Sequence, residues 1–274
     1  LAIFLLPPNV FTLVLALILL GIGGWESASL AGLNHRAGRI GWIVFLLIAG
    51  ALLIGLLHIP IAVPLLFGLA TLGWCILLLW LRHIDWGQAD ADRLQIRKLI
   101  IGGLILLPAF AAISWLQFSS PWLVLAVILV IAAADIGAFF TGRQFGGPKL
   151  ARQISPGKTW SGAIGGIFLA ALVFVLTFWL IPQMPLNITP THLLTLTIAG
   201  IAGALLALLS IGGDLTISLM KRQRGMKDTS SLLPGHGGLL DRFDSLAAAT
   251  PAFALMIWWA IKAEDAIICL SSGC

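Results

Sequence analysis

Long apolar runs dominate the sequence, and short clusters of charged, proline or glycine residues separate them. A helix needs about 20 mostly apolar residues to cross a bilayer, and each run reaches or approaches this length. The pattern therefore predicts an all-α fold: a polytopic integral membrane helical bundle with about eight complete transmembrane helices. These helices are expected at residues 10–31, 40–57, 60–81, 98–116, 121–141, 161–181, 193–220 and 244–262.

Residues 1–6 are also wholly apolar and precede Pro7 and Pro8, and the chain begins with Leu1 instead of methionine. We interpret this segment as the end of a further, truncated helix, with a methionine and a basic stretch expected upstream. The segment has no basic region and no small-residue cleavage site, so it does not indicate a secretory signal peptide.

The composition excludes an ordinary soluble protein, because 59% of the residues are hydrophobic, only 10% are charged and the mean hydropathy is +1.05. So many spans leave little chain for a separate domain outside the membrane. One transmembrane domain is expected over residues 1–274, with its polar motifs gathered between residues 130 and 245.

The charges are distributed unevenly between the two sides of the predicted bundle. Sixteen Lys and Arg residues against eleven Asp and Glu residues give a formal net charge of +5. All of these cations except Lys262 lie in or beside the loops at residues 32–39, 82–97, 142–160 and 221–243. The positive-inside rule predicts that these loops are cytoplasmic and that the C-terminus lies outside. The net charge thus reflects topology, and nothing else in the sequence favours nucleic acid as a partner.

The richest polar stretch covers residues 212–245. Asp214, Ser218 and Lys221 follow one another at i, i+4 and i+7, so they share one face of a helix as it leaves the bilayer. A face with a carboxylate, a hydroxyl and an ammonium group cannot point toward lipid, and we expect it to face a site.

A second carboxylate pair, Asp241 and Asp244, lies at i and i+3 where the next span begins. Two antiparallel helices can bring this pair close to Asp214. Clustered carboxylates with open positions suit Mg²⁺, which binds through a few protein oxygens together with water and substrate phosphates. The neighbouring cations would then face phosphate oxygens: Lys221, Arg222, Lys227 and Arg242.

The turn from Pro234 to Gly238 has little side-chain bulk and can let backbone N–H groups approach an anion. Within it, Gly237 and Gly238 follow His236, which is the only imidazole of the turn. His236 could act as an acid or base, or only position a phosphate. The simpler alternative is a hairpin whose histidine caps a helix, but the four aspartates around it are not needed for topology alone.

Asp135 lies inside an apolar span, where an ionisable side chain is costly and marks a functional site by default. A structural ion pair is the alternative interpretation of this residue.

Gly157, Lys158 and Thr159 look like the end of a phosphate-binding P-loop, but that motif requires glycine where Arg152 stands, and no strand is expected before it. The P-loop is therefore rejected. Ser155, Lys158 and Thr159 still form a candidate anion site just before a helix.

Several other polar residues have no partner that the sequence identifies: Glu26, His35, His58, His83, Asp85, Asp90, Asp92 and His192. Solvated or interfacial roles are favoured for them. Glu26 is the most interesting of these residues, because it follows Trp25 at the end of a span and could face the interior of the bundle.

Twelve positions in the last polar stretch form a dense pattern: Ser218, Lys221, Arg222, Lys227, Asp228, Pro234, His236, Gly237, Gly238, Asp241, Arg242 and Asp244. This pattern resembles that of the phosphatidate cytidylyltransferases, also called CDP-diacylglycerol synthases. The resemblance extends to Asp135 through Arg143 and to Ser155 through Gly162, and more loosely to Leu6 through Pro8 and to Trp25 and Glu26. It covers most of the chain in order and looks most like the proteobacterial branch, and it departs from the family only at the N-terminus.

The resemblance implies an enzyme that transfers CMP from CTP to phosphatidic acid, giving CDP-diacylglycerol and pyrophosphate, with Mg²⁺ and room for a second cation. It makes Asp214 and Asp241 the principal metal ligands, supported by Asp228 and Asp244. It implies catalytic roles for Lys221, Arg222, Lys227, Asp228, His236 and Arg242. It implies substrate binding by Asp135, Arg143, Ser155, Lys158, Thr159, Ser218, Gly237 and Gly238. The expected location is the bacterial inner membrane, with the active site facing the cytoplasm. A homodimer is a possible oligomeric state.

Two alternatives remain at this point. A secondary transporter would place its polar residues near the bilayer midplane in two related halves, whereas here they collect at helix ends and no repeat is detected. An enzyme could also use CTP with another acceptor, as a polyprenol kinase or a cytidylyltransferase for ether-linked lipid would. Acceptors tested side by side distinguish these enzymes, and consumption of CTP alone does not.

Overall fold

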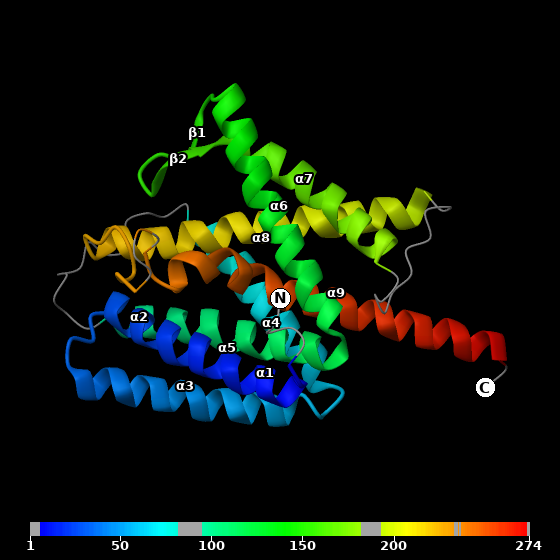
Figure 1. Cartoon of the computed structure of the whole chain (residues 1–274), viewed down its shortest axis with the longest axis horizontal. Helices are drawn as coiled ribbons and strands as arrows, with labels where there is room; N and C mark the ends of the chain where they lie inside the picture. The colour runs from blue at the N-terminus through cyan, green and yellow to red at the C-terminus, as the bar shows by residue number, and fades with distance from the viewer. Residues whose placement is uncertain (1–5, 82–94, 182–192, 233–234, 236, 273–274) are drawn as a thin grey trace.

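A computed structural model describes residues 6–81, 95–181, 193–232, 235 and 237–272 of the chain. Within these residues, eight helical segments are long and apolar enough to cross a membrane, which confirms the predicted number of spans and the helical bundle (Figure 1). The elements are α1 (Pro8–Leu15), the π-helical segment η2 (Ala16–Ile22), α2 (Gly23–Leu30), α3 (Arg36–Leu56), α4 (Ala62–Trp80), α5 (Ile96–Ser119), α6 (Pro121–Phe145), β1 (Lys149–Ala151), β2 (Ser155–Thr159), α7 (Trp160–Leu180), α8 (Leu193–Gln223) and α9 (Leu240–Ser272).

The first span is composite, because α1, η2 and α2 continue one another from Pro8 to Leu30. Pro8 stands in the first turn, where its missing N–H group leaves no hydrogen bond unmade. Residues 1–5 lie outside the described residues, so the truncated helix expected there stays a prediction.

Among the residues that the structure describes, a short hairpin between α6 and α7 is the one departure from the all-helical expectation. β1 and β2 pair antiparallel, with Lys149 opposite Thr159. The expectation that no strand precedes Gly157 is wrong, because β1 ends directly before Arg152. A strand of three residues is too short to produce a recognisable alternation, and only pairing with its neighbour defines it. The P-loop remains excluded, because the required glycine is absent and Lys158 lies in a strand.

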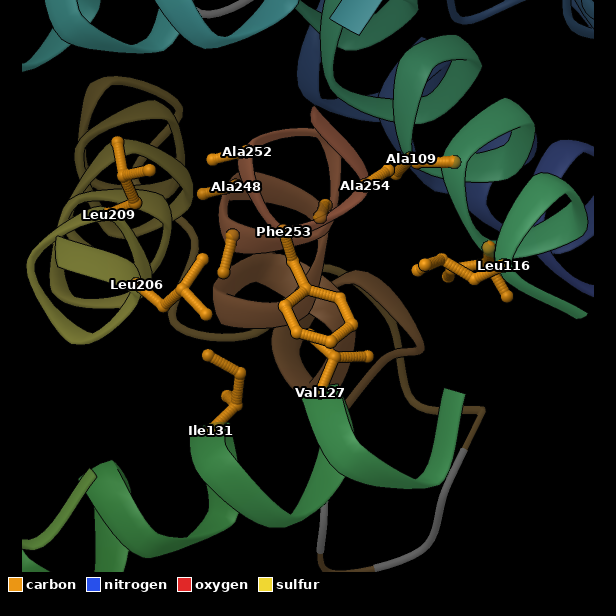
Figure 2. Close-up of a cluster of buried hydrophobic side chains, with 14 of the residues drawn as sticks. Ala109, Leu116, Val127, Ile131, Leu206, Leu209, Ala248, Ala252, Phe253 and Ala254 are labelled. Atoms are coloured by element: carbon orange, nitrogen blue, oxygen red, sulfur yellow. The ribbon is translucent and has the colours of Figure 1, made fainter. Parts of the chain in front are cut away.

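The core is built around α9. Figure 2 shows the fully buried ring of Phe253 from α9 among side chains of α8 and α6, including Leu206, Val127 and Ile131. Alanines such as Ala248 keep the surface of α9 small, so neighbouring helices approach closely. In a bilayer, such close van der Waals packing holds helices together, because lipid tails are as apolar as the side chains.

Glycines set the closest helix contacts. A Cβ atom on Gly166 of α7 would lie 2.6 Å from the backbone oxygen of Ala134 in α6. A Cβ atom on Gly213 of α8 would overlap the backbone oxygen of Asp244 in α9. These contacts bring α6 against α7 and α8 against α9 at the positions where the polar residues lie.

The described parts of the segments that were predicted to share one side of the membrane lie at one end of the bundle. The backbone N–H of Gln95 donates to the oxygen of Ala31 over 2.8 Å, joining the start of α5 to the end of α2. The Arg222 side chain donates to the oxygen of Ile154 in the hairpin over 3.4 Å. Which face of the membrane this end meets stays a prediction.

Candidate active site

The hairpin and the facing ends of α6 and α7 enclose a cavity of about 400 Å³. Four residues predicted to bind substrate line it: Asp135, Arg143, Lys158 and Thr159. Asp135 and Arg143 are exposed to this space, whereas Thr159 is buried. Ile211 of α8 also lines the cavity, so the cavity reaches the helix that carries Asp214.

Thr159 has a defined local role as the N-cap of α7. Its side-chain oxygen accepts a hydrogen bond from the N–H of Gly162 over 3.1 Å, and it lies 3.0 Å from the Ser161 hydroxyl oxygen. An N-cap satisfies one of the free N–H groups of the first helical turn. Thr159 therefore fixes the start of α7 beside the cavity, and Ser155, at the start of β2, is half-buried.

The shared face predicted for α8 is present. Ser218 donates to Oδ1 of Asp214 over 3.1 Å, as the i to i+4 spacing requires. Oδ2 of Asp214 forms an ion pair with Lys158 from the hairpin. About a third of each of these two side chains remains accessible, at 31% for Asp214 and 28% for Lys158. The cavity residues and the α8 face therefore belong to one site.

Asp241 lies in a different environment at the start of α9. Its Oδ1 atom accepts from Lys221 Nζ over 2.5 Å, and its side chain is only 8% exposed. Its Oδ2 atom accepts from the backbone N–H of Thr229 at 2.8 Å, the Thr229 hydroxyl at 2.9 Å and the N–H of Gly238 at 2.9 Å. Both oxygens are thus engaged, and Asp241 ties the loop between α8 and α9 to both helices.

Asp244 is 5% exposed and lies where α9 touches Gly213. Its Oδ1 atom accepts from the backbone N–H of Ser245 over 2.7 Å. The charges that act on it are those of Asp214, Lys158 and Lys221. Asp214 and Asp244, on separate helices, are therefore close enough to repel one another.

The solvated or interfacial role favoured for Glu26 is wrong, and the alternative, that Glu26 faces the interior of the bundle, is confirmed. Glu26 is 1% exposed and accepts hydrogen bonds from the N–H groups of Leu239 and Leu240, at 2.9 and 2.8 Å, which begin α9. It also accepts from the hydroxyls of Thr229 at 3.0 Å and Ser230 at 2.6 Å. The sequence signal for it was a carboxylate directly after Trp25 at the end of an apolar span, where an ionisable side chain is costly.

The glycines of the same loop are required by close contacts. Gly237 has φ +80°, and a Cβ atom there would lie 2.8 Å from Oδ2 of Asp241. A Cβ atom on Gly238 would lie 2.6 Å from Oε1 of Glu26. The roles predicted for these glycines in substrate binding remain predictions, and their observed role is to let the loop approach both carboxylates.

The remaining predicted residues lie around this loop. Arg222, Lys227, Asp228 and Arg242 are exposed, and Arg222 contacts the hairpin as described above. Asp228 approaches Gly237, because a Cβ atom there would lie 3.3 Å from Oδ1 of Asp228. His236 lies outside the described residues. The structure therefore joins the Asp214, Asp241 and hairpin groups, and leaves the other cations at the rim.

Among the residues that the structure describes, no group of three or more His, Cys, Asp and Glu side chains has the proximity of a metal site. The predicted ligation by Asp214, Asp241 and Asp244 stays a prediction. The donor chemistry nevertheless suits a cation, because Asp214 is accessible and the charge of the buried Asp244 acts against it.

A bundle of eight apolar helices, with paired lysines and carboxylates where the described spans end, defines a polytopic membrane protein with a charged site. The sequence profile of the Cytidylyltransferase family matches residues 1–260. The chain belongs to this family and is a nucleotidyltransferase.

The chain is also similar to individual phosphatidate cytidylyltransferases of bacteria. A phosphatidate cytidylyltransferase of Pseudomonas aeruginosa is 38% identical over 265 residues, which cover 93% of this chain and 90% of that protein. One of Haemophilus influenzae is 43% identical over 141 residues, covering 51% of this chain and 47% of the relative. One of Rickettsia bellii is 39% identical over 165 residues, covering 59% of this chain and 70% of the relative.

Proposed function

We propose that the protein transfers CMP from CTP to phosphatidic acid, producing CDP-diacylglycerol and pyrophosphate. The observation that carries this proposal is the ion pair of Lys158 with Asp214, which sets a cation and a carboxylate at a cavity of about 400 Å³. A second cation, Lys221, lies further along the same face of α8 and pairs with Asp241. The similarity to phosphatidate cytidylyltransferases over nearly the whole chain supports the choice of nucleotide and acceptor.

The reaction needs one bond to form and one to break. A phosphate oxygen of phosphatidic acid attacks the α-phosphorus of CTP, and the bond from that phosphorus to the bridging oxygen of the β-phosphate breaks, so pyrophosphate leaves. No covalent enzyme intermediate is required. The task of the protein is to hold two polyanions in line and to offset their charge, which is how positioning and preorganised electrostatics lower such barriers.

Different residues of this chain bind the nucleotide, offset the charge of the transferring group and meet the leaving pyrophosphate. Lys158 and Arg143, which line the cavity, bind phosphate oxygens of the nucleotide. Lys221 neutralises charge that develops on the transferring group, while Asp241 fixes its direction through the 2.5 Å contact. Arg222, Lys227 and Arg242, exposed at the rim, meet the departing pyrophosphate.

The resemblance makes Asp214 and Asp241 the principal metal ligands, but both oxygens of Asp241 already accept hydrogen bonds. We therefore further propose that Mg²⁺ is held through Asp214 and Asp244, with Asp241 and Asp228 supporting it, and that a second cation can join it. The fit rests on hard carboxylate oxygens and on the repulsion between Asp214 and Asp244, which a bound divalent ion would offset. When bound, the ion supplies Lewis-acid stabilisation of phosphoryl oxygens. We expect EDTA to abolish turnover and excess Mg²⁺ to restore it.

The proposed location is the inner membrane of a bacterium, with the site facing the cytoplasm, where CTP is available. Support comes from the bacterial relatives and from the basic loops gathered at this end of the bundle. The lipid would enter sideways with its tails in the bilayer. Homodimerisation stays a prediction, and the mass of the detergent-solubilised particle tests it.

The test is the conversion of radiolabelled CTP into chloroform-extractable product by purified protein in detergent. Phosphatidic acid, a polyprenol and an ether-linked phosphatidic acid analogue are offered separately, with no-lipid and EDTA controls. Label that enters the organic phase only with a phosphatidic acid and Mg²⁺ supports the proposal. Label that appears only with the polyprenol would replace the proposed acceptor, and inert protein with every acceptor would overturn the proposal.

A further inference from the structure

A second group of cations lies where α5 begins and α8 ends. Lys98 is 4% exposed, and its Nζ atom has no hydrogen-bond partner in the part of the chain that the structure describes. Within the same part, Nε and Nη1 of Arg224 and Nε2 of Gln95 are buried without partners. The charged groups that act on Lys98 are Arg224 and Arg97, both of them cations.

The unsatisfied atoms of this cluster are all donors, so the partner that would satisfy them is an acceptor. A buried ammonium group without a counter-charge is costly, which makes the favoured acceptor an anion. Gln95, Arg97 and Lys98 line a cavity of about 20 Å³. That volume admits one water-sized group, such as a single phosphate oxygen, while the exposed Arg97 can meet the rest of the phosphate.

This cluster is separate from the candidate active site, although both lie on α8. The face of α8 that lines the small cavity carries Thr216, Leu219, Met220 and Gln223. The face that belongs to the candidate active site carries Asp214, Ser218 and Lys221. With 3.6 residues per turn, the two sets lie on opposite sides of the helix. An anion at Lys98 would therefore not be a substrate in the site already described.

An apolar groove continues from the small cavity along α4 and α5. It has a volume of about 190 Å³ and is lined by Leu66, Leu69, Gly73, Leu77, Leu104 and Pro108, among others. Ile101 lines both the groove and the small cavity. Leu69 and Leu104 are 68% and 61% exposed, so the groove is open toward lipid. From Lys98 to Pro108 the helix rises about 15 Å, which is the depth of about one leaflet.

From these observations we infer that the protein binds one anionic glycerophospholipid at this place, with its phosphate at Lys98 and Arg97 and an acyl chain in the groove between α4 and α5. A donor-only cationic cluster that leads into an apolar groove one leaflet deep matches the two ends of such a lipid. A zwitterionic lipid is a poorer occupant, because its own cation would meet Arg97 and Lys98. The inference does not depend on the proposed reaction.

The experiment measures retained lipid directly. Purified full-length protein is exchanged into detergent with phosphatidylcholine and graded phosphatidylglycerol, and native mass spectrometry counts bound lipid. Phosphatidylglycerol has no terminal phosphate monoester and so cannot be the acceptor in the proposed reaction. We expect one tightly retained phosphatidylglycerol, and about tenfold weaker retention in Lys98→Met, which removes a charge-assisted contact. Arg36→Met is the control, because Arg36 is an exposed cation at the start of another span.

The acyl-chain half of the inference has its own matched pair. Gly73 lines the groove, and a Cβ atom there would have nothing within 4 Å, so Gly73→Leu can place its side chain in the groove. Gly68 lies in the same helix with equally open space and does not line the groove. We expect Gly73→Leu to weaken phosphatidylglycerol retention and Gly68→Leu to leave it unchanged.

Three results would overturn the inference. Equal retention by wild type and Lys98→Met would separate the lipid from this cluster. Displacement of the lipid by excess inorganic phosphate would make it a site for soluble anions. A fall in thermal stability of Lys98→Met without anionic lipid would mean that Lys98 has an internal partner, whereas an unpaired buried cation predicts unchanged or higher stability.

Discussion

Asp214 and Asp241 have the same chemistry and each pairs with a lysine, yet their surroundings differ. Asp214 is 31% exposed and holds one hydroxyl and one ammonium group beside an open cavity. Asp241 is 8% exposed, and its two oxygens hold an ammonium group, two backbone N–H groups and a hydroxyl. Asp214 can exchange its partners for a ligand at little cost, whereas Asp241 holds the loop and α9 in place. Asp214 is therefore available to bind a ligand, whereas Asp241 has a structural role.

The largest effect is expected from Asp214→Asn. We expect turnover to fall about 10²–10³-fold, because a charge next to the reacting phosphates is lost. The thermal unfolding temperature should stay near that of wild type, since a partly exposed pair contributes about 0–1 kcal/mol. Ser218→Ala, which removes only a neutral hydrogen bond, is the control and should cost less. Normal turnover of Asp214→Asn would contradict the division of roles.

Asp241→Asn should instead destabilise the fold. The substitution leaves Lys221, whose side chain is 14% exposed, without its counter-charge, and breaking a buried pair costs up to about 3–5 kcal/mol. Thermal unfolding in detergent measures the loss, and turnover should fall further than the folded fraction, because Lys221 also loses the contact that directs it. An unfolding temperature equal to that of wild type would mean that Asp241 does not anchor the loop.

Gly213→Ala tests whether the two carboxylates depend on the spacing of their helices. The added methyl group would overlap the backbone oxygen of Asp244 and push α8 away from α9. Turnover should fall about tenfold or more, because small misplacements of reacting groups are costly. Gly200→Ala in the same helix, where nothing lies within 4 Å, is the control and should be neutral.

The smallest effect is expected from Glu26→Gln. The amide would keep one acceptor but turn an N–H group toward donors, costing about 1–3 kcal/mol. Limited proteolysis between α8 and α9 should become faster, and Glu264→Gln, at an exposed position, should leave the rate unchanged. A cleavage rate unaffected by Glu26→Gln would contradict the role of Glu26 in holding the loop between α8 and α9.

The sequence predicted those parts of the molecule that are local. Run length located the eight spans, and spacing along one helix placed Asp214, Ser218 and Lys221 on one face. It did not predict the hairpin, whose strands are defined only by their pairing.

Contacts between distant segments were also beyond the sequence pattern. The ion pair of Lys158 with Asp214 and the hydrogen bond from Leu240 to Glu26 depend on how the helices pack. The spacing of residues along the chain carries no information on that packing. Lys98 looked like one more loop cation until its burial was known.

The most direct test follows the two ends of CTP separately in one reaction with phosphatidic acid. CTP labelled at the α-phosphate should transfer its label to the chloroform-extractable lipid, and CTP labelled at the γ-phosphate should release its label as water-soluble pyrophosphate. Label from the γ-phosphate in the lipid would mean phosphoryl transfer, and would contradict the nucleotidyl transfer that this account assigns to the site.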